Sequence, residues 1–267
     1  MLNPAIRVIP LRSGSSGNSV FISSRETRLL IDAGVNARTL EQSLASFGET
    51  AGHLDGLLIT HEHSDHINGV GVLMRRHRVP LYVNEKTWLA MRTTVGPVDE
   101  SLVHLIGTGS MTSIGDLSMT SFSVPHDAAD PVGYRIDTSR GPVTVLTDIG
   151  RMNSDLLAHA AGSKVVLIEA NYDHTLLMAG PYPMMLKQRI CGEYGHLSND
   201  DSATAVAALL DRGTSHFYLY HLSEQNNYPE LALLTVKNHL QQIGARLGQD
   251  LFLDVARRFT VSEPIGF

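Results

Sequence analysis

The sequence has few of the features that mark secreted and membrane-spanning proteins. Its 267 residues include one cysteine, Cys191, so no disulfide can form within the chain, as is usual in a reducing compartment. No run approaches the roughly 18 apolar residues of a membrane-spanning helix. No positively charged start leads into an apolar stretch, as a secretory signal would require. We therefore expect a cytoplasmic protein with no membrane partner.

An excess of positive charge is also missing. The formal net charge is −6, so no overall field draws the chain to nucleic acid, and any binding of a polyanion must be local. No internal repeat, low-complexity tract or linker divides the sequence. Hydrophobic residues make up 43% of the chain, enough for a sizeable core. We expect one domain over residues 1–267.

The most informative part of the sequence is a run of metal-binding residue types. After the apolar stretch Gly56–Ile59, the chain has the pattern HxHxDH, which contains His61, His63, Asp65 and His66. Imidazole suits zinc, and carboxylate adds affinity for manganese or iron. In an irregular turn, the first two histidines can face one centre while Asp65 and His66 face another. The run therefore predicts two divalent metal ions, with zinc expected first and manganese or iron left open.

Three more candidate ligands follow apolar strand-like segments. His126 comes after Phe122–Pro125, Asp148 after Val143–Thr147, and His221 after His216–Tyr220. Sites in layered α/β folds are built where buried strands end. Apart from His196, the remaining histidines lack such partners, and we assign structural or surface roles to them: His53, His77, His104, His159, His174, His216 and His239.

Hydrophobic patterning indicates an α/β protein made of two sheets with helices outside them. Strands are expected at Ala5–Leu11, Ser19–Ser23, Arg28–Ile31, Leu81–Val83, Leu102–Ile106, Leu117–Val124, Gly133–Asp137, Val143–Leu146, Val165–Ile168 and Phe217–Tyr220, with a terminal strand pair in Leu251–Val261. Helices are expected at Asn36–Phe47, Gly69–His77, Asn84–Met91, Asp200–Leu210 and Leu231–Ile243. Either Ser198 or Asn199 could cap the helix Asp200–Leu210.

Five ordered features make the sequence similar to the metallo-β-lactamase superfamily of hydrolases. They are Asp32 in Leu30-Ile31-Asp32-Ala33-Gly34, the HxHxDH run, His126, Asp148 and His221. The resemblance implies an αββα sandwich with the site at one edge between the sheets. It implies a first metal on His61, His63 and His126 and a second on Asp65, His66 and His221, with Asp148 bridging both. Asp32 would orient the ligand loop.

Four shorter segments resemble the YycJ (WalJ) branch of this superfamily. They are Ser13–Ser19, Glu169–Asp173, Gly180–Pro183 and Gly195–Asn199. Members of that branch are regarded as DNA exonucleases or phosphodiesterases. Related branches include a cyclic phosphodiesterase and ribonucleases of the tRNA-processing and β-CASP kinds. The sequence has no large insertion before His221 of the β-CASP kind, which speaks against a ribonuclease.

These observations predict a hydrolase that cleaves phosphodiester bonds, with DNA as the partner and a metal-bridging hydroxide as the nucleophile. We assign catalytic roles to Asp65 and His196. A protonated His196 could bind a phosphate oxygen or protonate the leaving oxygen, or it could simply cap its turn. The candidate substrate-binding residues are Ser16, Asn18, Asn171, His196 and Ser198, although such Ser and Asn side chains also stabilise turns.

Alternatives remain at this stage. Two divalent cations with Asp65, Asp148 and a hydroxide leave the site at about +1, which suits a phosphodiester monoanion. A small-molecule hydrolase of the same superfamily is the second hypothesis: a cyclic phosphodiesterase, lactonase or thioesterase. A non-catalytic module would be expected to lack ligands, and none is missing.

The basic cluster Arg75-Arg76-His77-Arg78 is explained equally well by DNA binding and by a solvated helix end. The sequence does not predict an oligomeric state.

Overall fold

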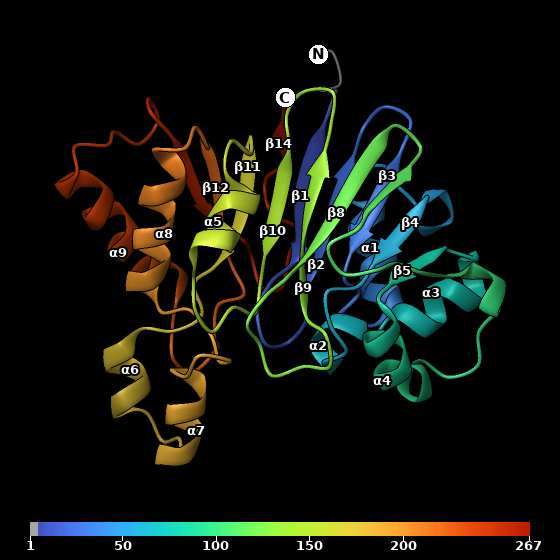
Figure 1. Ribbon diagram of the computed structural model, residues 1–267, viewed down its shortest axis with the longest axis horizontal. Coiled ribbons are helices and arrows are strands. Elements are labelled where there is room, and N and C mark those ends of the chain that lie inside the picture. The colour runs from blue at the N-terminus through green and yellow to red at the C-terminus, as the bar shows by residue number, and fades with distance from the viewer. Residues whose placement is uncertain (1–4) are drawn as a thin grey trace.

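The computed structural model describes residues 5–267, and two packed seven-stranded sheets form their centre (Figure 1). In spatial order, the first sheet contains β14 (Ile265–Gly266), β1 (Arg7–Arg12), β2 (Ser19–Ser23), β3 (Arg28–Ile31), β4 (Gly56–Leu58), β5 (Leu81–Val83) and β6 (Val103–Leu105). The second contains β13 (Phe252–Val255), β12 (His216–Tyr220), β11 (Val165–Glu169), β10 (Val143–Leu146), β9 (Val132–Asp137), β8 (Leu117–Ser123) and β7 (Met111–Ile114).

Helices lie outside the two sheets, and most of them cover a sheet face. They are α1 (Ala37–Ala45), α2 (Ser64–Ile67), α3 (Val70–His77), α4 (Glu85–Val95), α5 (Ser154–Ala160), α6 (His174–Ala179), α7 (Met184–Ile190), α8 (Asn199–Leu210) and α9 (Pro229–Gln242), with short 3₁₀ turns at Ala51–His53 and Glu100–Leu102. No helix in residues 5–267 is long and apolar enough to cross a bilayer. The α6–α7 pair projects from the sandwich beyond α8 (Figure 1).

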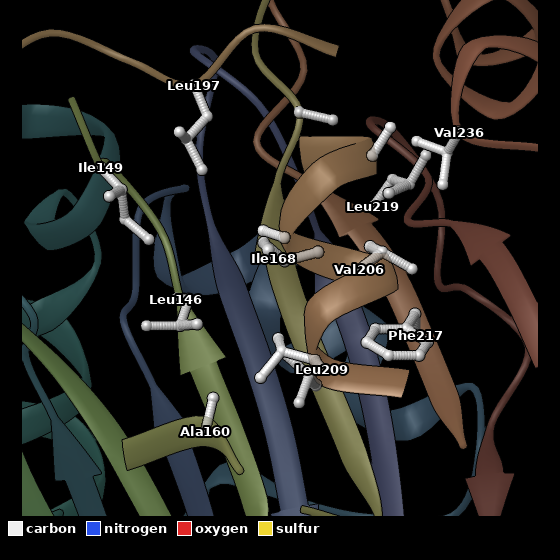
Figure 2. Close-up of a cluster of buried hydrophobic side chains, with 14 of the residues drawn as sticks. Leu146, Ile149, Ala160, Ile168, Leu197, Val206, Leu209, Phe217, Leu219 and Val236 are labelled. Atoms are coloured by element: carbon white, nitrogen blue, oxygen red, sulfur yellow. The ribbon is translucent and has the colours of Figure 1, made fainter. Parts of the chain in front are cut away.

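Three buried apolar clusters show why these layers form. One cluster lies between the sheets and joins residues such as Val20 and Leu58 of the first to Tyr134 and Leu167 of the second. A second packs the first sheet against α1, α3 and α4. The third packs the second sheet against α5, α8 and α9; Figure 2 shows its strand side chains facing those of α8 and α9. Burial of these faces drives an αββα sandwich, as predicted.

Each sheet is half parallel and half antiparallel, and this topology positions the site. Strands β3 to β6 pair in parallel in the first sheet, and β10 to β13 do so in the second. The carboxyl ends of parallel neighbours meet at the same edge of a sheet. The buried Tyr134 hydroxyl donates to the Ile59 carbonyl oxygen at 2.8 Å, and Val132 N–H donates to the Thr60 carbonyl oxygen at 3.0 Å, which joins the sheets beside that edge.

The terminal strand pair predicted within Leu251–Val261 is wrong. Only β13 forms there, in parallel with β12, and the chain then crosses to the other sheet, where β14 pairs with β1. The crossing is held by Ser262 N–H, which donates to the Pro10 carbonyl oxygen at 2.9 Å. The tail therefore finds its partner in a strand roughly 250 residues earlier, which local patterning cannot reveal.

Candidate metal and catalytic site

All seven predicted metal ligands lie together at the edge where strands end. His61 and His63 follow β4, and α2 then carries Asp65 and His66. This one-turn helix replaces the irregular turn expected across the whole motif. The other three ligands follow strands of the second sheet: His126 after β8, Asp148 after β10 and His221 after β12. Both sheets thus contribute donors to one location.

Backbone geometry turns three of these strand-end side chains. Asp32, Asp148 and His221 have φ angles of 59°, 55° and 56°, in the left-handed region that non-glycine residues seldom adopt. Each comes one or two residues after a strand: β3, β10 and β12 respectively. Such conformations cost on the order of 1 kcal/mol each and persist where the surroundings require them, often at functional sites. Their recurrence here marks this edge as a built site.

The first group of donors is formed by three histidines. His63 Nδ1 lies 3.1 Å from His61 Nε2 and 3.3 Å from His126 Nε2. Ligands of a tetrahedral zinc ion with bonds of about 2.1 Å lie about 3.4 Å apart. Converging imidazole nitrogens repel one another unless a proton or a cation lies between them. The spacing and the chemistry of these donors therefore fit a metal ion.

The second group adjoins the first through Asp148. Asp65 Oδ2 lies 3.5 Å from His66 Nε2 and 3.4 Å from His221 Nε2. The two oxygens of Asp148 face different groups: Oδ2 is 3.2 Å from His66 Nε2, and Oδ1 is 3.6 Å from His126 Nε2. This carboxylate is placed between the two sets of donors, which fit a pair of divalent ions that share one ligand.

The far nitrogens of the buried rings have partners of their own. His66 Nδ1 donates to Asp32 Oδ2 at 2.8 Å, and Asp32 also accepts from Thr60 N–H and Thr60 Oγ1, both at 2.8 Å. His126 Nδ1 donates to the Gly195 carbonyl oxygen at 3.1 Å. These hydrogen bonds fix the orientation of both rings and direct each Nε2 at the centre, as partners of metal-bound histidines do. Asp32 occupies the orienting position expected for it.

Glu169, at the end of β11, is a site residue that the sequence analysis did not identify as one. It is fully buried, and its Oε1 accepts from His221 Nδ1 at 2.7 Å and from His196 Nδ1 at 2.8 Å. Its Oε2 accepts from Ile149 N–H at 2.7 Å. The rule that located Asp148 and His221, a polar residue where a buried strand ends, would have located Glu169 as well.

His196 lines a cavity that His63, Asp65 and His126 also line, but it differs from the candidate ligand histidines. Its Nδ1 is occupied by Glu169, so a proton on Nε2 would face the cavity. Burial alone would lower the pKa of His196, but the Glu169 carboxylate outweighs it and raises that pKa. Glu169, His196, His221 and Asp148 also lie close enough to be grouped as ligands. We attribute their proximity to hydrogen bonding, because both ring Nδ1 atoms point at Glu169.

The pKa shifts of the site residues show where protons would lie if no cations were bound. Burial lowers the pKa of His61 and of His126. At His221, Asp148, Asp65 and Glu169 overcome burial and raise the pKa to about 10. The pKa of Asp65 and that of Asp148 are lowered, against the effect of burial, by His66 and His221. Protons therefore occupy places from which divalent cations would displace them, so cation binding would depend on pH.

Most of the predicted substrate-binding residues stabilise the site instead of facing the cavity. Buried Asn18 donates to Asp65 Oδ2 at 3.2 Å and accepts from Gly14 N–H at 2.8 Å. Asn171 Nδ2 donates to the His221 carbonyl oxygen at 2.8 Å. Ser198 caps α8, where its Oγ accepts from Asp201 N–H at 3.1 Å. The polar atoms of these residues are engaged by neighbouring backbone and side chains, and none of the three lines the cavity, so their role in substrate binding stays a prediction.

The predicted substrate-binding role of Ser16 also stays a prediction. Ser16 is exposed at the tip of a turn, and its neighbour Ser15 lines the cavity instead. Successive residues in a tight turn point in different directions, so identifying the segment does not identify the residue. Of the predicted substrate-binding residues, His196 lines the cavity.

The cavity has a volume of about 270 Å³ and two chemically different walls. His63, Asp65, Asp148 and His196 contribute to the polar wall, whereas Tyr182, Leu186 and Ile190 form an apolar wall. Arg189 of α7 pairs with Asp127 at the rim, next to His126. A polar substrate group can therefore lie against the donors while an apolar or aromatic group lies opposite.

The basic cluster of α3 is explained by pairing within the fold. Arg75 donates to the Val95 carbonyl oxygen at 2.9 Å, Arg76 pairs with Glu41 at 2.9 Å, and Arg78 pairs with Asp99 at 3.0 Å. The cluster also lies toward the carboxyl end of α3, whereas α2, which leads into α3, carries the ligands. We therefore favour the helix-end interpretation over DNA binding.

Comparison with known proteins shows which family shares this sequence. Residues 27–222, which include all seven candidate ligands, match the family model described as "Beta-lactamase superfamily domain". The chain is 43% identical over 242 residues to Exodeoxyribonuclease WalJ of Streptococcus pneumoniae serotype 2 (strain D39 / NCTC 7466), covering 90% of each protein. It is 36% identical over 239 residues to Exodeoxyribonuclease YycJ of Bacillus anthracis, again covering 90% of each.

A solved structure supports the fold separately. YhfI from Bacillus subtilis, described as a metallo-beta-lactamase fold protein, superposes with a TM-score of 0.72. The alignment covers 97% of this chain and 99% of that one, at 14% sequence identity. At this low identity the similarity concerns the fold alone. It covers nearly the whole chain, including both sheets and their helices.

Proposed function

This chain belongs to the metallo-β-lactamase superfamily and is a metal-dependent hydrolase, and we propose that it is an exodeoxyribonuclease that cleaves phosphodiester bonds at DNA ends. The observation that carries the proposal is the pair of buried donor groups joined by Asp148, with His196 in the same cavity. The substrate class follows from relatives named exodeoxyribonucleases that are 43% and 36% identical along most of the chain.

The donors would hold two divalent cations. His61, His63 and His126 would form one site and Asp65, His66 and His221 the other, and Asp148, whose two oxygens face different groups, would be shared. Mixed imidazole and carboxylate donors favour zinc, while manganese or iron are the alternatives. When bound, such ions supply positive charge for a phosphate and activate a water molecule. Asp65 contributes to catalysis by holding its site in place.

The remaining chemistry lies with His196 and Glu169. With Nδ1–H donated to Glu169, the ring can present Nε2–H to the oxygen that leaves the phosphorus. An imidazolium there would protonate that oxygen as the bond breaks, and the buried carboxylate would stabilise the ring's positive charge. The same carboxylate accepts a hydrogen bond from His221, so Glu169 would orient both a metal ligand and a proton donor.

Charge favours a phosphodiester over neutral esters. The carboxylates of Asp65, Asp148 and Asp127 line the cavity, so without cations it would repel an anion. With divalent ions in place, the cavity would attract a phosphodiester monoanion. A DNA substrate and a single cysteine both suit a cytoplasmic enzyme.

The test is a substrate panel with protein loaded in turn with zinc, manganese or iron. The panel contains single- and double-stranded DNA, RNA, bis-p-nitrophenyl phosphate, a lactone and a thioester. We expect mononucleotides to be released progressively from DNA ends, and Asp148→Ala to abolish this. Asp250→Asn, an exposed carboxylate paired with Arg246, is the matched control and should behave as wild type. Turnover of the lactone or thioester without degradation of DNA would replace this proposal with a small-molecule hydrolase.

A further inference from the structure

The apolar wall of the catalytic cavity has no role in the hydrolysis itself. Metal ions, a water molecule and a phosphate are all polar, yet Tyr182, Leu186 and Ile190 line one side of the space that they would occupy. Leu186 and Ile190 are four apart on α7 and share one helix face, and Tyr182 lies in the turn just before this helix. Tyr182 and Leu186 are each partly exposed, so both have surface available to a ligand.

This wall is held firmly although α6 and α7 project from the sandwich. Buried Lys187 of α7 donates to the Met178 carbonyl oxygen at 2.6 Å and to the Gly180 carbonyl oxygen at 2.8 Å, so it closes the carboxyl end of α6. His196 N–H donates to the Ile190 carbonyl oxygen at 2.9 Å. The wall is therefore linked directly to the turn that carries the proposed proton donor.

The charges near the wall also suit a nucleotide. Asp127 lines the cavity and is partly exposed, and the Arg189 guanidinium pairs with it. That pairing offsets a charge that would repel a second phosphate. Arg189 itself is 62% exposed, so its outer face is open to solvent beside the cavity mouth. An aromatic ring, two aliphatic side chains and a nearby guanidinium form a suitable surface for a base and sugar next to a phosphate.

We propose that Tyr182, Leu186 and Ile190 form a nucleoside subsite, in which the base attached to the scissile phosphate stacks on Tyr182. This inference rests on the proposed function and adds a positioning residue to it. Every base has a π face, so stacking of this kind is tolerant of sequence. The subsite would thus let a nuclease act on successive nucleotides of any identity while the phosphate stays aligned with His196.

The test compares two phosphodiesters that share one leaving group. Thymidine 5′-(p-nitrophenyl phosphate) carries a nucleoside, and methyl p-nitrophenyl phosphate does not. Tyr182→Ala should lower kcat/KM for the thymidine ester about 10-fold, within the range found for lost base stacking, and should change the methyl ester far less. Tyr182→Phe should keep most of the activity, because it keeps the ring. Tyr194→Ala is the control, since Tyr194 is 58% exposed and does not line the cavity.

A binding measurement separates this inference from the proposed function. Calorimetry on the metal-loaded protein should show tighter binding of thymidine 5′-monophosphate than of methyl phosphate, and Tyr182→Ala should remove the difference. Equal losses on both esters, or equal affinity for both monoesters, would overturn the subsite even if DNA is degraded. If the wild type hydrolyses neither ester and degrades no DNA, the proposed function fails, and the two affinities alone decide whether the subsite exists.

Discussion

At the scale of single residues, Glu169 orients two histidines of the site at once. One buried oxygen accepts hydrogen bonds from both His196 and His221, and so determines which nitrogen of each ring faces the cavity. In His221 that nitrogen points at Asp65, and in His196 it faces open space. The same carboxylate therefore prepares one ring as a ligand and the other as a proton donor, and the difference comes only from what lies opposite each ring.

The role of His196 as a proton donor predicts a dependence on the leaving group. His196→Ala should retain two metal ions per chain, because the seven proposed ligands remain. Its turnover of DNA should fall by about 10²-fold, the lower end of what general acids contribute. Its turnover of bis-p-nitrophenyl phosphate should fall much less, because p-nitrophenolate leaves without a proton. Metal analysis with kinetics on both substrates checks this, and equal losses on both would assign His196 to phosphate binding instead.

Sequence reasoning predicted which candidate metal donors cluster better than it predicted the roles of the residues around them. The donors could be predicted because a ligand type at the end of a buried strand is a local pattern, as at Asp148 and His221. The partners of Asn18 and Asn171 could not, because they lie in segments that meet only in the fold: Asn18 contacts Asp65, and Asn171 contacts the backbone of His221. A polar side chain in a loop has the same sequence pattern whether it binds substrate or backbone.

At the scale of elements, strands were predicted well where strong apolar runs mark them, and short helices were not. No helix was predicted at α5, α6 or α7, which have seven, six and seven residues. Helices this short show less than two turns of periodicity and depend on tertiary packing for stability. The capping residues Asn153 and Asp173 mark the starts of α5 and α6, and these signals could have been used.

Glu49 joins elements that are distant in sequence, and it gives a prediction for pH dependence. This buried carboxylate, in the segment after α1, pairs with Arg7 of β1 and Arg28 of β3. Burial would raise the pKa of Glu49, but the two guanidinium groups lower it overall. Because the pKa is lower in the folded protein than in the unfolded chain, this group stabilises the fold above the unfolded value of about 4.3. The contribution is lost as the pH falls through the lower folded value.

Glu49→Gln should therefore reduce the free energy of unfolding by about 2 kcal/mol at pH 7. The difference from wild type should shrink steadily as the pH is lowered below about 4.3. Urea unfolding at several pH values measures this. Asp250→Asn, which removes an exposed ion pair with Arg246, is the control and should have little effect at any pH. A difference that stays constant with pH would mean that Glu49 acts through packing alone.

At the scale of the whole molecule, the site is also a joint between the two sheets. Four candidate ligands follow β4 of the first sheet, and three follow strands of the second: His126, Asp148 and His221. The apolar core between the sheets holds the sandwich together, and each sheet packs separately against its own helices. Cations at this edge would add a second link between the sheets, and would neutralise carboxylates that otherwise face one another across it.

Removal of the metal ions should therefore lower the stability of the entire fold. A ligand present at about 1,000 times its dissociation constant adds about 4 kcal/mol, which for a chain of this size corresponds to a fall in Tm on the order of 10 °C after chelation. Calorimetric scans before and after treatment with a chelator, and after zinc is restored, measure this. Asp148→Ala is the informative variant, because Asp148 faces both donor groups, so its Tm should respond little to chelator or zinc. A wild-type Tm that did not change on verified loss of metal would show that the apolar core alone holds the sheets together, and that the ions serve only chemistry.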